Sequence, residues 1–324
     1  MRDLLNYWKR IFKVYLTREK GYLGFWHEIP AISNGITPDK LGPYYMTFSD
    51  KANYRGPRDG DGVILFDYYG DIGRQYNPLA VAQYGLGHYN LYLKTRDKKN
   101  LREAEIQAKW LVKNLEMNEH GLLVWKHHFR WRYKQYLEAG WYSAHSQGTG
   151  ISLLARMYKE TRDDRYLRAA HDAFISMTVL MNKGGVQYID SNNNIWLEEY
   201  LIEPPTCILN GFLWALWGVW DFYLFTKDSE AKTVFEKCIT TLKKNLSRFD
   251  WGIWSLYDLS HQALKMVASP FYHKLHIVQL HATGIITHDQ FFESYAKKFE
   301  SYERNPIYRL ISFIYKVVFK LVYF

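Results

Sequence analysis

Thr161-Arg162-Asp163 belongs to a set of four Thr-x-Asp tripeptides that decide the fold of this chain. The other copies are Thr95-Arg96-Asp97, Thr226-Lys227-Asp228 and Thr287-His288-Asp289, and successive copies are 66, 65 and 61 residues apart. Each copy follows an apolar run with helical spacing and precedes a more charged run. Four copies at a near-constant step indicate a repeat architecture. Because Thr and Asp side chains accept hydrogen bonds from the free N–H groups at a helix start, each copy predicts the turn of a helical hairpin.

A second repeated element stands before each hairpin. It is a short glycine-led stretch rich in aromatic or β-branched residues, and it predicts a short strand or β-hairpin. The four stretches begin at Gly62, Gly121, Gly185 and Gly252. Each repeat is therefore expected to be a β segment, an inner helix, a Thr-x-Asp turn and an outer helix.

The helices of each expected hairpin differ in character. The first helices, near 78–93, 147–159, 208–224 and 273–285, are apolar on nearly every face and contain small residues. The second helices, such as 100–114 and 165–181, have one apolar stripe and one charged face. Buried helices alternating with amphipathic ones indicate two concentric layers. Because the atypical capping repeats of an open solenoid are not obvious, we expect a mainly α fold in which four hairpins close into an (α/α)4 toroid, with short β-hairpins at the mouth of a cleft.

Three regions are expected along the chain. Residues 1–60, with Pro30, Pro43 and Pro57, form a small β-containing and loop-rich lead-in, with a leading helix at its start. Residues 61–305 form the toroid that carries catalysis, and residues 306–324 form a basic amphipathic segment. This last segment and the similar start of the chain either pack on the core or touch an anionic membrane surface without crossing it.

The charge and the aromatic content of the chain indicate which kinds of molecule it binds. The net charge of +9 favours acidic partners, and the basic residues show no nucleic-acid-binding signature, so we expect an acidic polysaccharide or anionic lipid and no nucleic acid. Aromatic residues make up 18% of the chain, which fits either a thick core or a cleft whose walls stack on sugar rings. Only two cysteines are present, and no signal peptide or spanning segment is apparent, so we expect a cytoplasmic protein. A peripheral membrane contact and a homodimer are left open.

The loops leading into the inner helices should share one mouth, and two of their features carry chemistry. The run Lys126-His-His-Phe-Arg-Trp-Arg132 is either a solvated strand or a site for carboxylate or sulfate groups. The adjacent Glu198 and Glu199 cannot share one face of a strand. In one interpretation, one of the two points inward and has a raised pKa that suits acid–base chemistry. In the other, the two form an exposed pair. No metal-ligand spacing or cofactor fingerprint is present, so neither a metal nor a cofactor is expected.

Several multi-residue stretches resemble the D-glucuronyl C5-epimerases of heparan sulfate biosynthesis. They are Leu197-Glu-Glu-Tyr200 followed by Leu209-Asn-Gly-Phe212, Pro78-x-x-x-Ala82-Gln-Tyr-Gly-Leu86, Trp141-Tyr-Ser-Ala144, Tyr257-Asp-Leu259 with His261, and Tyr272-His273 with His276. The resemblance spans roughly residues 60–305 in one order. It implies conversion of D-glucuronate units in a polymer to L-iduronate, by removal of the C5 proton and reprotonation from the opposite face.

The resemblance implies that Tyr200, Tyr257 and Tyr272, with Glu199 beside them, are the catalytic residues. Which tyrosine serves which face of the sugar ring stays open. The expected substrate-binding residues are Asn210, Arg74, Tyr76, Tyr84, Lys126, His128, Arg130, Tyr142, Gln147, His261 and His276.

One departure affects the substrate. The family usually has Arg directly after Tyr-Asp-Leu, and this chain has Ser260, so recognition of carboxylate or sulfate is expected from Arg74 or from residues 126–132. A microbial uronate glycan is therefore favoured over heparan sulfate. The alternatives are a polysaccharide lyase, which begins with the same proton abstraction, a glycoside hydrolase using Glu198 or Glu199 with Asp258, and a glycan-binding protein without catalysis.

Overall fold

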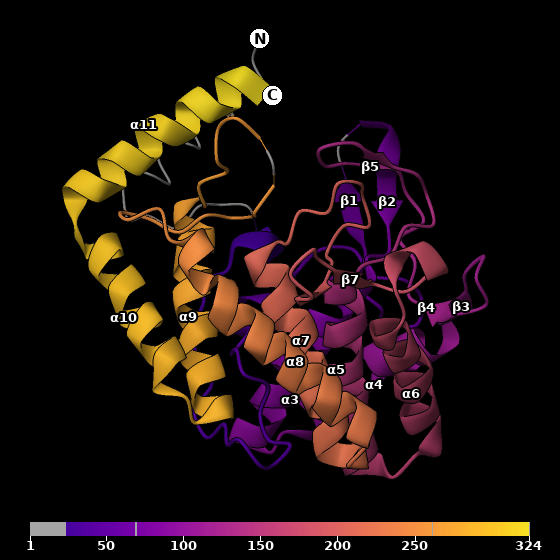
Figure 1. Cartoon of the computed structure of the whole chain (residues 1–324). Coiled ribbons are helices and arrows are strands. Elements are labelled where there is room, and N and C mark those ends of the chain that lie inside the picture. Colours follow the sequence, from indigo (N-terminus) through magenta and orange to yellow (C-terminus); the bar gives the residue numbers. More distant parts are fainter. Residues whose placement is uncertain (1–23, 69, 261, 324) are drawn as a thin grey trace.

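Four helical hairpins build the body of the protein, whose computed structural model describes residues 24–68, 70–260 and 262–323 (Figure 1). They pair α3 (Pro78–Thr95) with α4 (Lys98–Lys113), α5 (Ala144–Thr161) with α6 (Asp164–Thr178), α7 (Leu209–Thr226) with α8 (Ser229–Asn245), and α9 (Pro270–Thr287) with α10 (Gln290–Arg304). The expectation of a mainly helical α/α toroid made of four hairpins is confirmed.

The Thr-x-Asp turns share one geometry. The central residue of each turn, Arg96, Arg162, Lys227 or His288, has a left-handed backbone with φ between 52° and 61°. Its backbone N–H closes the preceding helix, and the following Asp accepts a backbone N–H of the next one, as Asp97 does from Lys99 (2.9 Å) and Asp228 from Ala231 (2.8 Å). The tripeptide therefore ends one helix and begins the next.

Small residues let the inner helices approach closely. A Cβ on Gly218 of α7 would collide with the backbone of Gly148 of α5, and a Cβ on Gly85 of α3 would collide with Leu153. By contrast, the outer helices keep a charged face: α10 buries only Phe292, Ala296, Phe299 and Tyr302. This gives the two layers that the hydrophobic pattern predicts.

Each of the first three hairpins is preceded by short antiparallel strands. The pairs are β1 (Phe66–Tyr68) with β2 (Gly73–Gln75), β3 (Glu116–Met117) with β4 (Leu123–Val124), β5 (Trp131–Arg132) with β6 (Tyr136–Leu137), and β7 (Gln187–Ile189) with β8 (Ile195–Leu197). In the fourth repeat the described residues form two isolated antiparallel bridges, between Asp250 and Ser255 and between Leu256 and Val267. In Figure 1, β1, β2 and β5 lie beyond one end of the helices.

The lead-in is tied to three inner helices. It contains a 3-10 turn (Gly24–His27) and the short helix α2 (Ser49–Ala52). The Tyr45 hydroxyl donates to Asp221 of α7 (2.7 Å), which also pairs with Arg156 of α5 (2.6 Å), and Asn90 of α3 donates to the Met46 carbonyl (2.8 Å). The Arg156–Asp221 pair is fully buried, so losing one partner would leave an uncompensated charge. This network holds residues 41–52 against the inner layer.

The C-terminal segment forms a helix, α11 (Pro306–Tyr323), which crosses above α9 and α10 in Figure 1. Its lysines do not make the basic outer face that the sequence suggested: Lys316 is buried and donates to the Val267 carbonyl (2.6 Å). The exposed face is apolar and consists of Ile307, Leu310, Ile311, Ile314, Val318, Leu321 and Val322. No helix in the described part of the chain is long and apolar enough to span a bilayer. Membrane contact through the termini stays a prediction, and the start of the chain lies outside the described residues.

Candidate functional site

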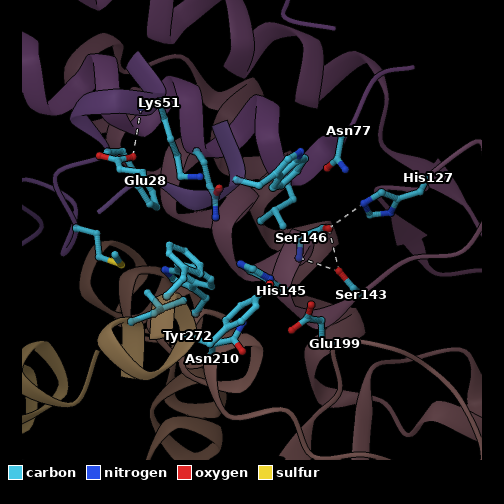
Figure 2. Close-up of a pocket in the computed structure, with 18 of the residues that line it drawn as sticks. Glu28, Lys51, Asn77, His127, Ser143, His145, Ser146, Glu199, Asn210 and Tyr272 are labelled. Atoms are coloured by element: carbon cyan, nitrogen blue, oxygen red, sulfur yellow. Dashed lines mark hydrogen bonds between the residues drawn. The ribbon is translucent and has the colours of Figure 1, made fainter. Parts of the chain in front are cut away.

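A cavity of about 340 Å³ opens between the lead-in and the loops that enter α3, α5, α7 and α9. Ten of its lining residues are aromatic, which matches the sequence-based idea of a cleft that stacks on sugar rings. The polar lining comes from the lead-in, from the starts of α3, α5 and α7, and from the segments that contain His127 and Glu199; Figure 2 labels most of these side chains. The polar and charged lining residues are Glu28, Lys51, Asn77, Gln83, His127, Ser143, His145, Ser146, Glu199 and Asn210.

Glu198 and Glu199, which follow β8, make different contacts. Both are buried, so the exposed-pair alternative is excluded. The Glu198 carboxylate turns back to accept the backbone N–H groups of Thr206 and Cys207 (3.0–3.3 Å), and thereby holds the loop that leads into α7. Glu199 instead enters the cavity, where its Oε2 atom has no hydrogen-bond partner in the part of the chain that the structure describes. Only Glu199 is therefore free to act on a ligand.

Tyrosines surround Glu199. Tyr200 and Tyr272 line the cavity with it, and Tyr272 stands on the first turn of α9. Tyr257 packs edge-on against Tyr272, with ring centroids 4.8 Å apart, and is not itself among the lining residues. Tyr133 stacks on Tyr200 at 4.3 Å and donates to Asp258 (2.8 Å). The structure thus brings together all four residues expected to be catalytic, and adds Tyr133.

Burial determines the protonation states of Glu199 and of the tyrosines around it. Desolvation raises the pKa of Glu199 to about 8, with Glu198 nearby as a smaller cause. The pKa of Tyr200, Tyr257 and Tyr272 is raised as well, first by burial and then by the charge of Glu199. The phenols are therefore neutral proton donors at neutral pH, and Glu199 is a carboxyl group of unusually high basicity.

Several buried polar atoms of the cavity lining are available to bind a ligand. Within residues 24–68, 70–260 and 262–323, no hydrogen-bond partner is present for Oε2 of Glu199, Oδ1 of Asn210, Nε1 of Trp214 or either ring nitrogen of His145. All four residues line the cavity. Because an unsatisfied buried polar group costs ~1–3 kcal/mol, a hydroxyl-rich ligand in this cavity would recover much of that cost.

The basic run 126–132 divides between two faces. His127, Phe129 and Trp131 line the cavity, and His127 stacks on Trp141 at 3.7 Å. Lys126 and Arg130 point away from it: Lys126 donates to the Met117 carbonyl, and Arg130 pairs with Glu138. His128 likewise pairs with Glu116 (2.7 Å). The cause is the alternation of side chains along extended backbone, so the three residues expected from this run to bind substrate lie outside the cavity.

Most of the other expected substrate-binding residues also lie away from the cavity. Arg74 is exposed and pairs with Asp67, and the Tyr76 hydroxyl donates to Asp59. Four more hold the structure together: Tyr84 contacts Arg58 and Glu103, Tyr142 donates to the Gly184 carbonyl, Gln147 bonds the backbone of Trp125, and His276 bonds Ser255. His261 lies outside the described residues. Asn210 alone among the described members of this set lines the cavity.

The sequence patterns did not single out the residues that the lead-in and the start of α5 contribute to the cavity. Glu28 and Lys51 come from the lead-in, which carries no recognisable motif, and His145 stands two residues after Ser143, the cap of α5. His145 stacks on Trp214 (4.4 Å, 12°), and burial holds its pKa well below the usual value, so its ring is neutral. The stretch Trp141-Tyr-Ser-Ala144-His145 could have signalled it. No cluster of three His, Cys, Asp or Glu side chains suited to a metal occurs among residues that the structure describes.

Residues 117–301 match the family model described as the D-glucuronyl C5-epimerase C-terminus. This match covers more than half of the chain. The chain belongs to the D-glucuronyl C5-epimerase family.

Two relatives show how far the likeness extends. A D-glucuronyl C5-epimerase of Caenorhabditis elegans is 32% identical over 210 residues, which are 60% of this chain and 34% of that protein. The uncharacterized protein MJ1128 of Methanocaldococcus jannaschii is 30% identical over 254 residues, 71% of this chain and 80% of that protein. The chain thus spans about a third of the length of the nematode epimerase.

Among solved structures, the cellobiose 2-epimerase of Spirochaeta thermophila resembles this chain with a TM-score of 0.48 and 8% identity, over 68% of this chain and 57% of that one. The matched region of the epimerase family includes the positions of Glu199, Asn210, Tyr257 and Tyr272. It does not reach the lead-in, so Glu28 and Lys51 lie outside it.

Proposed function

We propose that this protein is a C5-epimerase of uronate units in an acidic polysaccharide, converting D-glucuronate to L-iduronate. Membership of the D-glucuronyl C5-epimerase family supports an enzyme of carbohydrate epimerisation. The observation that most strongly supports a reaction at C5 of a uronate is the position of Glu199. It is a buried carboxyl group of raised pKa inside an aromatic cavity that the phenol of Tyr272 also lines, and its Oε2 atom has no hydrogen-bond partner among the described residues.

Glu199 is the base of the proposed reaction. The proton on C5 lies next to a carboxylate and is weakly acidic, so its removal requires a strong, desolvated base. In its ionised form Glu199 has this character because burial has raised its pKa to about 8. Its Oε2 atom is not engaged by any described side chain, so it can approach the sugar directly.

Tyr272 is the proton donor. Glu199 follows β8 and Tyr272 stands on the first turn of α9, so the two groups enter the cavity from separate segments; Figure 2 labels both. The raised pKa keeps the Tyr272 phenol protonated until it is needed. Tyr257, packed against Tyr272, stabilises the phenolate that forms, since its hydroxyl lowers the pKa of Tyr272.

The proton count of the proposed step balances. The C5–H electron pair stays on the substrate as Glu199 takes the proton, and the same carbon then takes the Tyr272 proton on its other face. The sugar is inverted at C5, Glu199 is left as the acid and Tyr272 as the phenolate. Exchange with water returns both groups to their starting states. Because the incoming proton comes from a group that exchanges with solvent, product formed in heavy water carries deuterium at C5.

A polysaccharide lyase is the rival that uses the same first step, since a C5 carbanion can instead expel the C4 substituent. Incubation with glucuronate-containing polysaccharides in heavy water distinguishes the two. We expect deuterium at C5, iduronate signals by NMR and an intact chain length. An unsaturated uronate with ultraviolet absorption would show a lyase. Binding without any isotope exchange would show a glycan-binding protein.

A further inference from the structure

We propose that Lys51 is the residue that recognises the substrate carboxylate. This inference rests on the proposed function, because it assigns the uronate carboxyl group to one end of the same cavity. Neither the epimerase family match nor any sequence motif assigns a role to this lysine, which lies in the lead-in.

The position of Lys51 suits an anion. Its side chain is 5% exposed and lines the cavity from helix α2. One of its three N–H groups is given to the Phe25 carbonyl (2.6 Å), and the ammonium lies over the Phe25 ring at 4.2 Å from the centroid. No carboxylate among the described residues lies within salt-bridge distance of it. Two donors therefore remain for a ligand.

Glu28 keeps this lysine charged without occupying it. The two Glu28 oxygens accept the backbone N–H groups of Asp50 (3.0 Å) and Lys51 (3.3 Å). The carboxylate is thus held by backbone amides, although its charge still raises the pKa of Lys51 against the larger, opposite effect of burial. The resulting pKa of about 8 leaves the ammonium mainly protonated at neutral pH.

The rest of the cavity offers no competing cation. Lys51 is the only lysine or arginine among the described residues that line it. Arg74, Lys126 and Arg130, the cations suggested by sequence, each use their head group on a protein oxygen outside the cavity. His127 and His145 are neutral, since burial lowers the pKa of both imidazoles. Among the described residues, a carboxylate that enters the cavity therefore meets positive charge only at Lys51.

The arrangement also suits the reaction. Figure 2 shows His145 between Lys51 and Glu199, so the cavity has a cationic end and an acid–base end. A uronate whose carboxylate reaches Lys51 would have that charge neutralised next to C5, which makes the C5 proton easier to remove. Lys51 would then supply what Ser260 cannot in this chain. Gln83 lines the same cavity, and its Oε1 atom accepts no hydrogen bond from any described residue.

The test compares binding of two probes by titration calorimetry or NMR. One is an oligosaccharide that contains glucuronate, and the other is the same oligosaccharide after its carboxyl groups have been reduced to alcohols. We expect the wild-type protein to prefer the acid, Lys51→Met to lose that preference by about tenfold or more, and Lys51→Arg to keep it. The matched control is Lys316→Met, because Lys316 is also a buried lysine that donates to a backbone carbonyl but does not line the cavity.

The outcomes separate the two claims. A folded Lys51→Met protein with the wild-type preference overturns the inference, as does a wild-type protein that does not prefer the acid. Equal loss in Lys51→Met and Lys316→Met would mean that general destabilisation causes the change, and would also overturn it. A Lys51-dependent preference without isotope exchange at C5 would instead leave the carboxylate site standing and refute the epimerase reaction.

Discussion

Gly211 and Glu199 are in direct contact: a Cβ on Gly211 would overlap the Glu199 carboxylate and stand 2.8 Å from its Cβ. Gly211 lies in the first turn of α7, beside Asn210. The Leu209-Asn-Gly-Phe212 stretch therefore leaves room for the proposed base, and a glycine is needed there for space, since its φ lies outside the left-handed region.

Gly211→Ala should therefore displace Glu199. Because the new methyl group needs the volume of the carboxylate, we expect a loss of C5 exchange activity of ~100-fold or more from misplacement of the base. The matched control is Gly60→Ala, since a Cβ on Gly60 meets nothing within 4 Å. Isotope-exchange rates, with circular dichroism to confirm folding, give the measurement. Full activity in Gly211→Ala would mean that the position of Glu199 is unimportant.

The pH dependence of kcat/KM should be bell-shaped around pH 8. Activity rises as Glu199, with a pKa of about 8, becomes a carboxylate, and falls as Lys51, also with a pKa of about 8, loses its charge. Lys51→Arg should remove the falling limb, because the guanidinium stays protonated over this range. Initial rates of deuterium incorporation between pH 6 and 10 give the measurement. An unchanged falling limb in Lys51→Arg would exclude Lys51 as its source.

Glu199 should also make folding stability depend on pH. The unfolded chain releases this proton near 4.5, the ordinary pKa of a glutamate side chain, whereas the folded protein holds it until about pH 8. The folded state thus binds more protons in this window, and its stability falls as pH rises through it. Glu199→Gln removes this effect, so the variant should exceed the wild type by a few kcal/mol at pH 9 and match it near pH 4. Urea unfolding at both pH values measures the difference, and a pH-independent difference would contradict the assigned burial.

Asp228→Ala tests the repeated turn. The Asp228 side chain accepts the backbone N–H of Ala231 and so caps α8. Its loss should cost about 1 kcal/mol of unfolding free energy. Glu230→Ala, in the same first turn but exposed and without a cap contact, should cost only ~0.3 kcal/mol through the helix dipole. Equal effects of the two changes in thermal unfolding would show that the Asp of Thr-x-Asp does not act as a cap.

The repeat made the toroid predictable, but only to the level of elements. Thr-x-Asp marks the hairpin turns, and apolar helices alternate with amphipathic ones. The assignment of helices to the inner or the outer layer therefore follows from the repeat in the sequence alone. Helix starts were less predictable: α5 begins at Ala144 and α9 at Pro270, ahead of the expected 147 and 273, because Ser143 and Ser269 supply caps. The left-handed residue of each turn gave no signal, since Arg, Lys and His occupy it rather than glycine.

The candidate site was predictable where a motif carries it. Glu199, Tyr200, Asn210, Tyr257 and Tyr272 stand in stretches that resemble the epimerases, and the structure brings them together. The orientation of the side chains in residues 126–132 was not predictable, because composition does not show on which face of an extended segment each side chain lies. Lys51 could not be found at all, since it reaches the cavity only through the folding of a segment that contains no motif.

The most direct test of the central claim is C5 deuterium incorporation into a glucuronate polysaccharide in heavy water, measured by NMR for the wild type, Glu199→Gln and Tyr272→Phe. We expect the wild type to incorporate deuterium and form iduronate without chain cleavage. Both variants should be folded and lose at least ~100-fold in rate. Wild-type rates in the folded Glu199→Gln variant would contradict the assignment of Glu199 as the base, and with it the proposed mechanism.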